Sequence, residues 1–382
     1  MKVVIAGGGT GGHIFPAVAV IEALRASGYD VDVTLIGTRR GLEGWLASRV
    51  GYKAYFIFAR ALPRRLGIGS VISVLAASIG FIQSLLLLLC LRPDAVIATG
   101  GYASAPCIVA ARIVGCPIIM IEPNVIPGRT TRLLSRFVDE VALGFSEAVQ
   151  HFRKGTNLRV TGIPTRLSLQ QHTREEALEH LGLDHGRKTI FIFGGSRGAS
   201  SINRAFIDAM RFLEQRDDLQ FIVQTGQQDY DLVYEHARTS RIRIRVQAFF
   251  DDIGMAYVAS DLVVCRAGAG TIAEITALGL PSILVPYPYA MAGHQQANAE
   301  MMVANGAAIL IPDSELSGKR LADAIVALLE DPRGLEQMAE QARHLGRPDA
   351  AREIAADIVG LMKHRSRLSR LAAIIGEICS VR

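Results

Sequence analysis

The chain has 382 residues, and its length suits two domains that are each large enough for their own core. A net charge of +5 favours anionic partners, either phosphorylated substrates or anionic lipid. Aromatic residues make up only 6%, which argues against a stacking platform for nucleic acid. The five cysteines lack C-x-x-C spacing, so we expect a reduced, cytoplasmic protein without a disulfide framework or zinc site.

The N-terminus reads MKVVIAGGGTGGHIFP. We expect a strand at Lys2–Ala6, a glycine loop at Gly7–Gly12 and a helix that begins near His13. The apolar stretch is too short for a signal peptide. Glycines permit close backbone approach, and the first N–H groups of a helix attract anions. The loop therefore predicts a site for a phosphate or for developing negative charge.

The same loop matches the dinucleotide fingerprint G-x-G-x-x-G through Gly7, Gly9 and Gly12. That fingerprint requires an acidic residue at the end of the second strand, about 20 residues later. Here the expected second strand ends in Gly37-Thr38-Arg39-Arg40. A dinucleotide oxidoreductase therefore stays open as an alternative, but it rests on this loop alone.

Strands alternate with helices along the chain, and the pattern restarts at a second glycine loop, Gly194–Gly198. Such alternation predicts parallel sheets, so the expected fold is α/β with two Rossmann-like doubly wound domains facing a central cleft. The hinge is expected near Gly162–Thr165. Ligands bind beyond the carboxyl ends of the strands in such sheets. The expected strands are 2–6, 31–36, 54–58, 95–98, 117–121, 140–143, 188–193, 219–224, 243–247, 261–265, 282–285 and 308–311.

The segment 66–91 contains no charged residue and is long enough to span a membrane. Small and polar residues dilute it, and it leads into the expected strand 95–98, so a membrane span would divide the domain. Two interpretations stay open. It forms one or two buried helices, or it is an apolar patch in the headgroup layer, flanked by Arg60, Arg64 and Arg65. The second interpretation predicts peripheral binding to an anionic membrane surface.

A second site is expected where Arg266–Thr271 leads into a helix that contains Glu274. A carboxylate there can accept hydrogen bonds from ribose hydroxyls. Alternatively, Thr271 and Glu274 form a capping box and need no ligand. Gln295 and Gln296 open the following helix, where their amides either bind sugar hydroxyls or belong to the surface.

A metal site is poorly supported by the sequence. The D-x-D pattern at Asp30-Val31-Asp32 enters a strand at the wrong edge of its sheet. The same pattern at Asp229-Tyr230-Asp231 is typical of the first turn of an exposed helix. Glycine loops, helix ends and Arg166 or Arg197 can balance a diphosphate, so we expect no metal and no other cofactor.

Eight motifs, in this order and spacing, resemble the peptidoglycan N-acetylglucosaminyltransferases of glycosyltransferase family 28, which have the GT-B fold and convert lipid I to lipid II. The resemblance covers nearly the whole chain. The motifs are GGGTGGHIFPA, GGYASAP, EPNVIPGRTTR, TGIPTR, GGSRGASSIN, FFDDIGMAYVASD, CRAGAGTIAEI and HQQANA.

The resemblance implies an N-terminal, membrane-facing acceptor domain at 1–163 and a C-terminal domain at 164–344 that binds UDP-N-acetylglucosamine. A helix at about 345–364 is expected to pack back on the first domain, and 365–382 reads as a basic amphipathic tail whose role stays open between a second lipid contact and a solvated helix. The location implied is the cytoplasmic face of the bacterial inner membrane.

For the donor, the resemblance implies that Ser196 contacts the diphosphate, the backbone of Phe250 reads uracil, and Glu274 binds ribose. Gln295 and Gln296 would hold the sugar. The full implied donor set is Thr10, Gly11, Gly12, Asn124, Arg166, Ser196, Phe250, Arg266, Ala269, Gly270, Thr271, Ile272, Ala273, Glu274, Gln295 and Gln296.

For the acceptor, an undecaprenyl-diphosphate-linked muramoyl pentapeptide, the implied residues are Gly9, His13, Tyr102, Ser104 and Asn124. His13 is the leading candidate for the general base that takes the proton from the C4 hydroxyl, because a helix N-terminus disfavours its charged form. Alternatively, His13 only orients the loop. Glu122 is the reserve candidate.

One departure from the family concerns the acceptor side. This chain has Ile121-Glu122-Pro123-Asn124 where the family usually has His-Glu-Gln-Asn. A related GT-B glycolipid synthase with another lipid acceptor therefore stays open, as does a non-catalytic module that binds nucleotide sugars.

Overall fold

The computed structural model describes the chain except residues 8–10, 40–50, 61–67, 167–168, 170 and 381–382, and except the side chains of 11–13, 68–71 and 366–380. The chain divides into two compact units. The N-terminal unit comprises Met1–Pro164 together with Asp349–Arg382, and the C-terminal unit comprises Thr165–Pro348.

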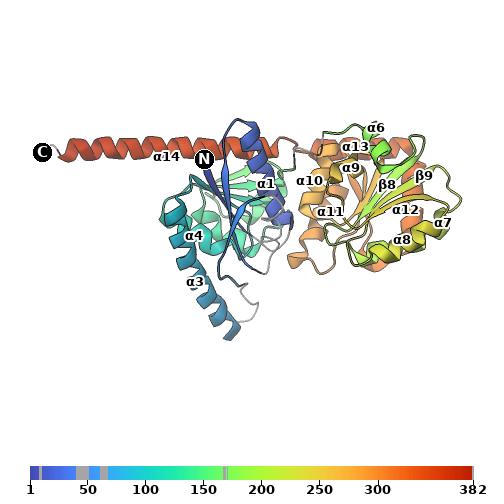
Figure 1. Ribbon diagram of the computed structural model, residues 1–382, viewed down its shortest axis with the longest axis horizontal. Coiled ribbons are helices and arrows are strands. Elements are labelled where there is room, and N and C mark those ends of the chain that lie inside the picture. Colours follow the sequence, from blue (N-terminus) through green and yellow to red (C-terminus); the bar gives the residue numbers. More distant parts are fainter. Residues whose placement is uncertain (8–10, 40–50, 61–67, 167–168, 170, 381–382) are drawn as a thin grey trace. The chain divides into compact units, whose positions relative to one another are not determined.

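The N-terminal unit is built on a seven-stranded parallel sheet with the order β3-β2-β1-β4-β5-β6-β7. Its strands are β1 (Lys2–Ala6), β2 (Asp32–Gly37), β3 (Lys53–Phe56), β4 (Ala95–Ala98), β5 (Ile118–Glu122), β6 (Glu140–Leu143) and β7 (Leu158–Val160). Its helices are α1 (Gly11–Ala26), α3 (Ile68–Leu91), α4 (Ala105–Ile113), α5 (Arg129–Leu134) and α14 (Ala350–Ser380). Figure 1 labels α1, α3, α4 and α14 of this unit.

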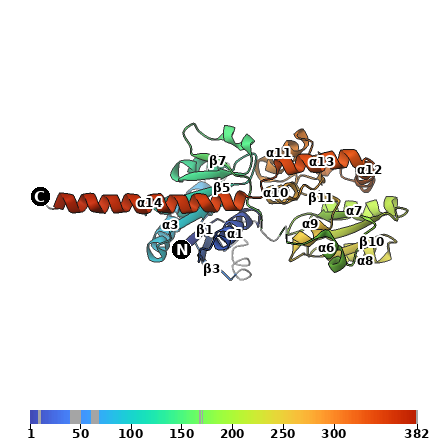
Figure 2. The ribbon, with the colours of Figure 1, turned by 90° about the horizontal axis from the view of Figure 1, so that it is seen from above.

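Alternate residues of the central strand β1 face two separate cores. Val3 and Ile5 pack with α1 and with Ile354 and Ile358 of α14. Val4 packs on the opposite face with the cluster that contains Leu88 of α3 and residues of α4. A strand that is buried on both faces belongs to the centre of a doubly wound sheet. The last helix of the chain therefore helps to cover a sheet made from the first 160 residues, as seen from above in Figure 2.

The C-terminal unit has a six-stranded parallel sheet with the order β10-β9-β8-β11-β12-β13. Its strands are β8 (Lys188–Phe193), β9 (Leu219–Gln224), β10 (Arg243–Gln247), β11 (Leu262–Cys265), β12 (Ser282–Leu284) and β13 (Ala308–Leu310). Its helices are α6 (Arg174–Leu181), α7 (Ser200–Leu213), α8 (Tyr230–Thr239), α9 (Ile253–Val258), α10 (Ala269–Leu278), α11 (His294–Ala304), α12 (Gly318–Leu329) and α13 (Pro332–Leu345).

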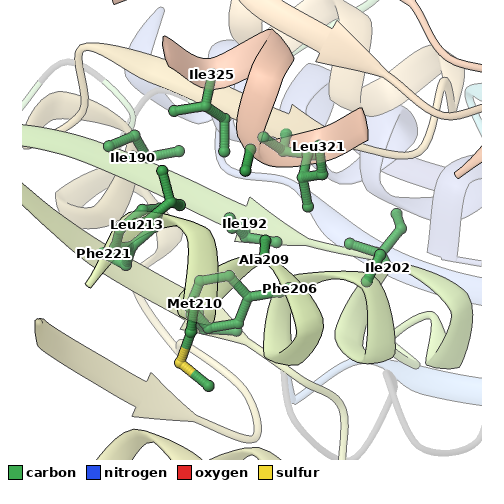
Figure 3. Close-up of a cluster of buried hydrophobic side chains, with 14 of the residues drawn as sticks. Ile190, Ile192, Ile202, Phe206, Ala209, Met210, Leu213, Phe221, Leu321 and Ile325 are labelled. Carbon is green, nitrogen blue, oxygen red and sulfur yellow. The ribbon is translucent and has the colours of Figure 1, made fainter. Parts of the chain in front are cut away.

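One face of this sheet is covered by α7 and α12. Ile192 of β8, Phe206 of α7 and Ile325 of α12 meet in the buried cluster drawn in Figure 3. The helical spacing of apolar residues in α7 produces this contact, because Ile202, Phe206, Met210 and Leu213 all fall on its buried side. The predicted α/β class with two doubly wound parallel sheets is confirmed.

The uncharged segment forms one long helix, α3, of which only one side is buried. The helix α3 packs against α4. Ser73, Ser84 and Leu88 are buried, whereas Leu75 and Leu86 are each 59% exposed. The interpretation of this segment as buried helices is therefore wrong. Among the described residues, Ile72–Leu91 is the stretch with the length and apolar composition of a membrane span, with a mean hydropathy of 2.4 and 17% of that window buried.

Two further details differ from the expected strands. The edge strand β7 was not expected, because Leu158–Val160 has only three residues and two of them are exposed. Short, exposed strands lack the apolar run that marks a central strand. Elsewhere the observed strands begin or end within two residues of the expected positions, for example at β3 and β12.

Candidate active site

The glycine loop after β8 is held against the loop after β9 by two glycines. A Cβ on Gly198, whose φ is +77°, would lie 1.9 Å from the carbonyl oxygen of Thr225. A Cβ on Gly226, with φ of +75°, would lie 2.2 Å from the carbonyl oxygen of Arg197. Only glycine allows backbones to approach this closely at positive φ. The crossing leaves Ser196 and Arg197 exposed just before α7 begins, as a phosphate site at a helix N-terminus requires.

Gln224 connects this loop to the predicted uracil reader. Its amide nitrogen donates to the carbonyl oxygen of Gly195 at 3.2 Å, and its amide oxygen accepts from the backbone N–H of Phe250 at 2.9 Å. Gln224 is 1% exposed, and Phe250 is 5% exposed. Gln224 therefore connects the loops after β8, β9 and β10. The backbone N–H of Phe250 already donates a hydrogen bond within the unit.

Glu274 lies in α10 at the same edge of the sheet. Its Oε2 accepts from the Tyr257 hydroxyl at 2.8 Å, and its Oε1 lies 4.0 Å from a guanidinium nitrogen of Arg166. The side chain is 16% exposed. Burial raises the pKa of Glu274, while the Arg166 charge and the Tyr257 hydrogen bond oppose that rise. A partly accessible carboxylate with fixed partners is well suited to accept hydrogen bonds from a diol.

The alternative of a capping box is wrong. The N-cap residue of α10 is Gly268, with no side-chain capping bond, and Thr271 is already the third residue of the helix. The first turn supplies the rest of the predicted nucleoside segment. Ile272 is fully buried, so only its backbone could contact a nucleoside. Gly270 faces open space, because a Cβ at this position would meet no atom within 4 Å. Ala269 and Ala273 are each 8% exposed.

Arg266 is neutralised inside the unit. One guanidinium nitrogen donates to Asp313 at 2.5 Å and to the carbonyl oxygens of Val285 and Pro286, and the other donates to Ser201 at 2.8 Å. Its side chain is 11% exposed, and it lies over the ring of Tyr287, 5.4 Å from the centroid. Arg266 therefore connects the loops after β11 and β12 to α7.

The two glutamines differ in their surroundings. Gln295 accepts from the backbone N–H of Tyr287 at 2.9 Å, so its amide oxygen is used to hold the loop that precedes α11. Gln296 is exposed and donates to Glu300 at 2.9 Å, one turn along the same helix. Ser196, Phe250, Arg266, Glu274 and both glutamines all follow carboxyl ends of strands in one parallel sheet, so the structure gathers them along one edge.

Several residues predicted for the N-terminal unit lie outside the description. Gly9 and Thr10 are not among the described residues, and Gly11, Gly12 and His13 are described only as backbone in the first turn of α1. The arginines Arg64 and Arg65 also lie outside it, whereas Arg60 is described and exposed.

The loop after β1 packs closely against the end of β4. A Cβ on Gly7 would lie 1.9 Å from the Thr99 hydroxyl oxygen. Beyond Thr99, Gly100 and Gly101 both have a φ of +76°. Ser104 is buried and donates to the carbonyl oxygen of Gly101 at 2.9 Å, whereas Tyr102 is partly exposed. Ser104 therefore shapes this turn, and Tyr102 is the more accessible of the two predicted acceptor residues.

Glu122, the reserve candidate for the general base, is buried and accepts hydrogen bonds from the loop after β5. Its Oε1 accepts from the backbone and side-chain nitrogens of Asn124, both at 3.1 Å, and its Oε2 accepts from the backbone N–H of Gly128 at 3.1 Å. The side chain is thus turned toward its own loop. This geometry supports a positioning role for Glu122, with Asn124 as the residue that it orients.

Within the described residues, no group of three or more His, Cys, Asp and Glu side chains has an arrangement that could hold a metal ion. In the second D-x-D pattern, Asp229 accepts from Ser200 at 2.7 Å and from Asn203 at 2.8 Å. It fastens the start of α7 to the start of α8.

Comparison with known proteins identifies the family. Residues 3–143 match the model of the glycosyltransferase family 28 N-terminal domain, and residues 189–354 match that of the C-terminal domain. The chain belongs to glycosyltransferase family 28. This membership makes it a glycosyltransferase and replaces the alternative of a dinucleotide oxidoreductase.

Curated relatives of this family 28 enzyme cover almost its full length. A protein of Desulforudis audaxviator is 41% identical over 356 residues, which is 92% of this chain and 95% of the relative. A protein of Chlorobium limicola is 40% identical over 95% of this chain and 100% of its own length. Both are named UDP-N-acetylglucosamine–N-acetylmuramyl-(pentapeptide) pyrophosphoryl-undecaprenol N-acetylglucosamine transferase.

Solved structures share the fold. The crystal structure of MurG from Acinetobacter baumannii superimposes with a TM-score of 0.73 at 28% identity, covering 94% of this chain and 99% of that one. The UDP-GlcNAc 2-epimerase of Neisseria meningitidis has a TM-score of 0.64 at 15% identity over 94% of this chain and 99% of its own, a likeness of fold alone. These neighbours agree with the expected GT-B architecture.

Three partners of the predicted site residues were missed from the sequence of this family 28 enzyme. Tyr257, Gln224 and Asp313 bind predicted site residues that lie 17, 26 and 47 positions away, respectively. No local spacing marks such pairs. The available signal was topological, because each of the three lies in a strand, helix or loop beside the carboxyl edge of the second sheet.

Proposed function

We propose that the chain transfers N-acetylglucosamine from UDP-N-acetylglucosamine to the C4 hydroxyl of undecaprenyl-diphospho-muramoylpentapeptide, with inversion at the anomeric carbon. The observation that carries the proposal is the carboxylate of Glu274, which accepts from Tyr257 and lies at the same sheet edge as the glycine loop of the C-terminal unit. A ribose acceptor and a phosphate cradle on one sheet edge match a nucleoside diphosphate. The names of relatives that are about 40% identical over nearly the whole chain support this donor and acceptor.

In this proposal the donor is held by the C-terminal unit. Ser196 and the first N–H groups of α7 bind the diphosphate, the backbone around Phe250 meets the base, and Glu274 binds ribose. Gln295 and Gln296 hold the sugar. The family resemblance also assigns Thr10, Gly11, Gly12 and Asn124 to the donor. Arg266 acts through the loops that it joins, which follows from its pairing with Asp313.

His13 is the proposed general base for the acceptor hydroxyl. A base is needed because the hydroxyl must lose its proton as it attacks the anomeric carbon. The negative charge that develops on the departing UDP is stabilised by helix N–H groups and by Arg197 or Arg166, so the proposal includes no metal and no other cofactor. Tyr102, Ser104 and Asn124 shape the acceptor side.

We further propose that the enzyme binds the cytoplasmic face of the plasma membrane peripherally, through the exposed side of α3. Leu75, Ile79, Ile82, Leu86 and Leu89 are between 49% and 59% exposed on this helix. Arg60 precedes it, and Arg64 and Arg65 are assigned to the same surface by sequence. An apolar stripe beside basic residues suits a headgroup layer with anionic lipid. This surface would bring the enzyme to its lipid-linked acceptor.

A donor-transfer assay tests the proposed reaction. Radiolabelled UDP-N-acetylglucosamine is supplied with lipid I or with diacylglycerol, and product is measured for intact protein, His13→Ala and Glu274→Ala. Transfer to lipid I alone supports the proposal, while transfer to diacylglycerol alone would indicate a glycolipid synthase. We expect His13→Ala to lose turnover with donor binding intact, and Glu274→Ala to lose donor binding. Normal turnover by His13→Ala would remove it as the base.

A further inference from the structure

Tyr257 is a buried residue of α9 whose hydroxyl is turned toward the proposed ribose carboxylate. It is 0% exposed, and its hydroxyl donates to Oε2 of Glu274 at 2.8 Å. A buried tyrosine hydroxyl needs a hydrogen-bond partner, and here a carboxylate from a different helix is that partner. The pair therefore links α9, which follows the Phe250 loop, to α10, which follows the Arg266 loop.

The ring of Tyr257 is held by the aromatic residues of β8. It packs edge-on against Phe191 at 5.5 Å and Phe193 at 5.7 Å, with interplanar angles of 82° and 80°. Those two rings are stacked at 4.5 Å. Edge-to-face packing on two stacked rings, in a close-packed interior, limits the movement of the tyrosine ring. The hydroxyl is consequently a fixed donor, and it fixes the carboxylate that accepts from it.

The hydrogen bond also favours the charged form of the carboxylate. Burial raises the pKa of Glu274, and both the Tyr257 hydroxyl and the Arg166 guanidinium act in the opposite direction. A protonated carboxyl group accepts fewer hydrogen bonds from a diol than a carboxylate does, because one of its oxygens carries a proton and becomes a donor. Removal of the Tyr257 hydroxyl would thus favour the neutral form of Glu274 and would allow the Glu274 side chain to adopt other rotamers.

We propose that Tyr257 is a positioning residue for the donor nucleoside, and that its hydroxyl holds Glu274 in the orientation and charge state that accept both ribose hydroxyls. The inference rests on the proposed function, since it concerns the same donor site. By positioning Glu274, Tyr257 contributes to the preference of the site for a ribonucleotide over a 2′-deoxyribonucleotide. A site built to accept a hydroxyl rejects the analogue that lacks it more strongly than a loosely ordered site does.

The experiment compares the binding of two nucleotides to three proteins. Dissociation constants of UDP and 2′-deoxy-UDP are measured by calorimetry between pH 5 and pH 8 for the wild type, Tyr257→Phe and Tyr230→Phe. Tyr230 lies on α8 and stacks on Tyr234. Tyr230→Phe is the control, because it removes a tyrosine hydroxyl of the same unit that does not contact Glu274. Circular dichroism verifies that each variant is folded.

For Tyr257→Phe we expect UDP to bind about tenfold more weakly at neutral pH, as the loss of one hydrogen bond to a charged group predicts. Binding of 2′-deoxy-UDP should weaken much less, so the preference for UDP narrows. The loss of UDP binding on acidification should begin at a higher pH than in the wild type. In the transfer assay, KM for the donor rises while kcat stays unchanged, and Tyr230→Phe behaves as the wild type.

Two results would overturn the inference while leaving the proposed function intact. Equal weakening of both nucleotides would show that Tyr257 only supports the fold, and unchanged binding by Tyr257→Phe would show that Glu274 needs no such partner. A wild-type protein that is folded and binds neither nucleotide would instead refute the proposed function, and the positioning role with it.

Discussion

Arg159 of β7 and Asp357 of α14 are hydrogen-bonded across 198 positions of sequence, and the pair fastens the last helix of the chain to the edge of the N-terminal sheet. Arg159 also donates to Glu353 at 3.2 Å. The neighbouring strand β6 begins with Glu140, which faces Asp357. Oε1 of Glu140 and Oδ2 of Asp357 are both buried, and these two carboxyl groups interact with each other. Three carboxylates thus surround one guanidinium.

This cluster predicts that the N-terminal unit loses stability as pH rises. Burial and the Asp357 charge raise the pKa of Glu140 to about 7, from an ordinary value of 4.5. A carboxyl group with a raised pKa binds a proton on folding, so its contribution is fully present below the unfolded pKa and is lost as pH rises through 7. We expect the free energy of unfolding in urea to fall by about 1–2 kcal/mol between pH 5 and pH 8, after allowance for solvent screening.

Glu140→Gln should remove most of this pH dependence, because a neutral amide needs no proton. The matched control is Glu147→Gln on the exposed turn that follows β6. Urea unfolding curves at four pH values check the prediction. An undiminished slope in Glu140→Gln would mean that another group is responsible.

A second prediction concerns the crossing of the two glycine-containing loops in the C-terminal unit. Gly198→Ala places a Cβ 1.9 Å from the Thr225 carbonyl oxygen at a φ of +77°, so the loops must separate. Gly195→Ala has a comparable φ of +92° but no atom within 4 Å of the new Cβ. We expect Gly198→Ala to lose at least tenfold in affinity for UDP, and to lose about 2–4 kcal/mol of stability.

Gly195→Ala is the control for backbone strain without collision, and it should cost about 1 kcal/mol. Calorimetric titration with UDP and thermal unfolding measure both effects. Equal losses in the two variants would show that strain matters and the crossing does not.

A third prediction separates a scaffolding role of Arg266 from direct phosphate binding. Asp313→Ala leaves the guanidinium of Arg266 buried without its anionic partner, and we expect a loss of about 2–3 kcal/mol of stability. The loops around Arg266 would shift, so KM for the donor should also rise. Asp323→Ala breaks the exposed ion pair with Lys319 and should cost less than about 1 kcal/mol. If freeing Arg266 instead tightens UDP binding, the arginine acts on the phosphates.

The sequence predicted the sheets better than the contacts within the site. Runs such as Lys188–Phe193 are apolar because both faces of a parallel strand are buried, and the following glycines mark loops at the carboxyl edge. That logic located Ser196 and Glu274. It did not find Tyr257 or Asp313, because side-chain partners brought together by strand order leave no mark in local spacing.

The exposed side of α3 illustrates the same limit. Composition marks the segment as apolar, but the choice between a buried helix and a surface patch depends on which neighbours cover it. The packing of α3 against α4 settles that choice, with Leu88 on the covered side and Leu86 on the exposed side.

The fourth prediction uses this pair of leucines, two positions apart in α3. Leu86 is 59% exposed and Leu88 is 1% exposed. If the exposed side enters the headgroup layer, Leu86→Gln should weaken binding to phosphatidylglycerol vesicles about tenfold, with stability changed by less than about 0.5 kcal/mol. Leu88→Gln should instead cost about 2–4 kcal/mol of stability, because it buries an amide in the core of the N-terminal unit. Flotation and urea unfolding measure the two effects, and flotation of Leu86→Gln at the wild-type level would show that this side of α3 does not contact the membrane.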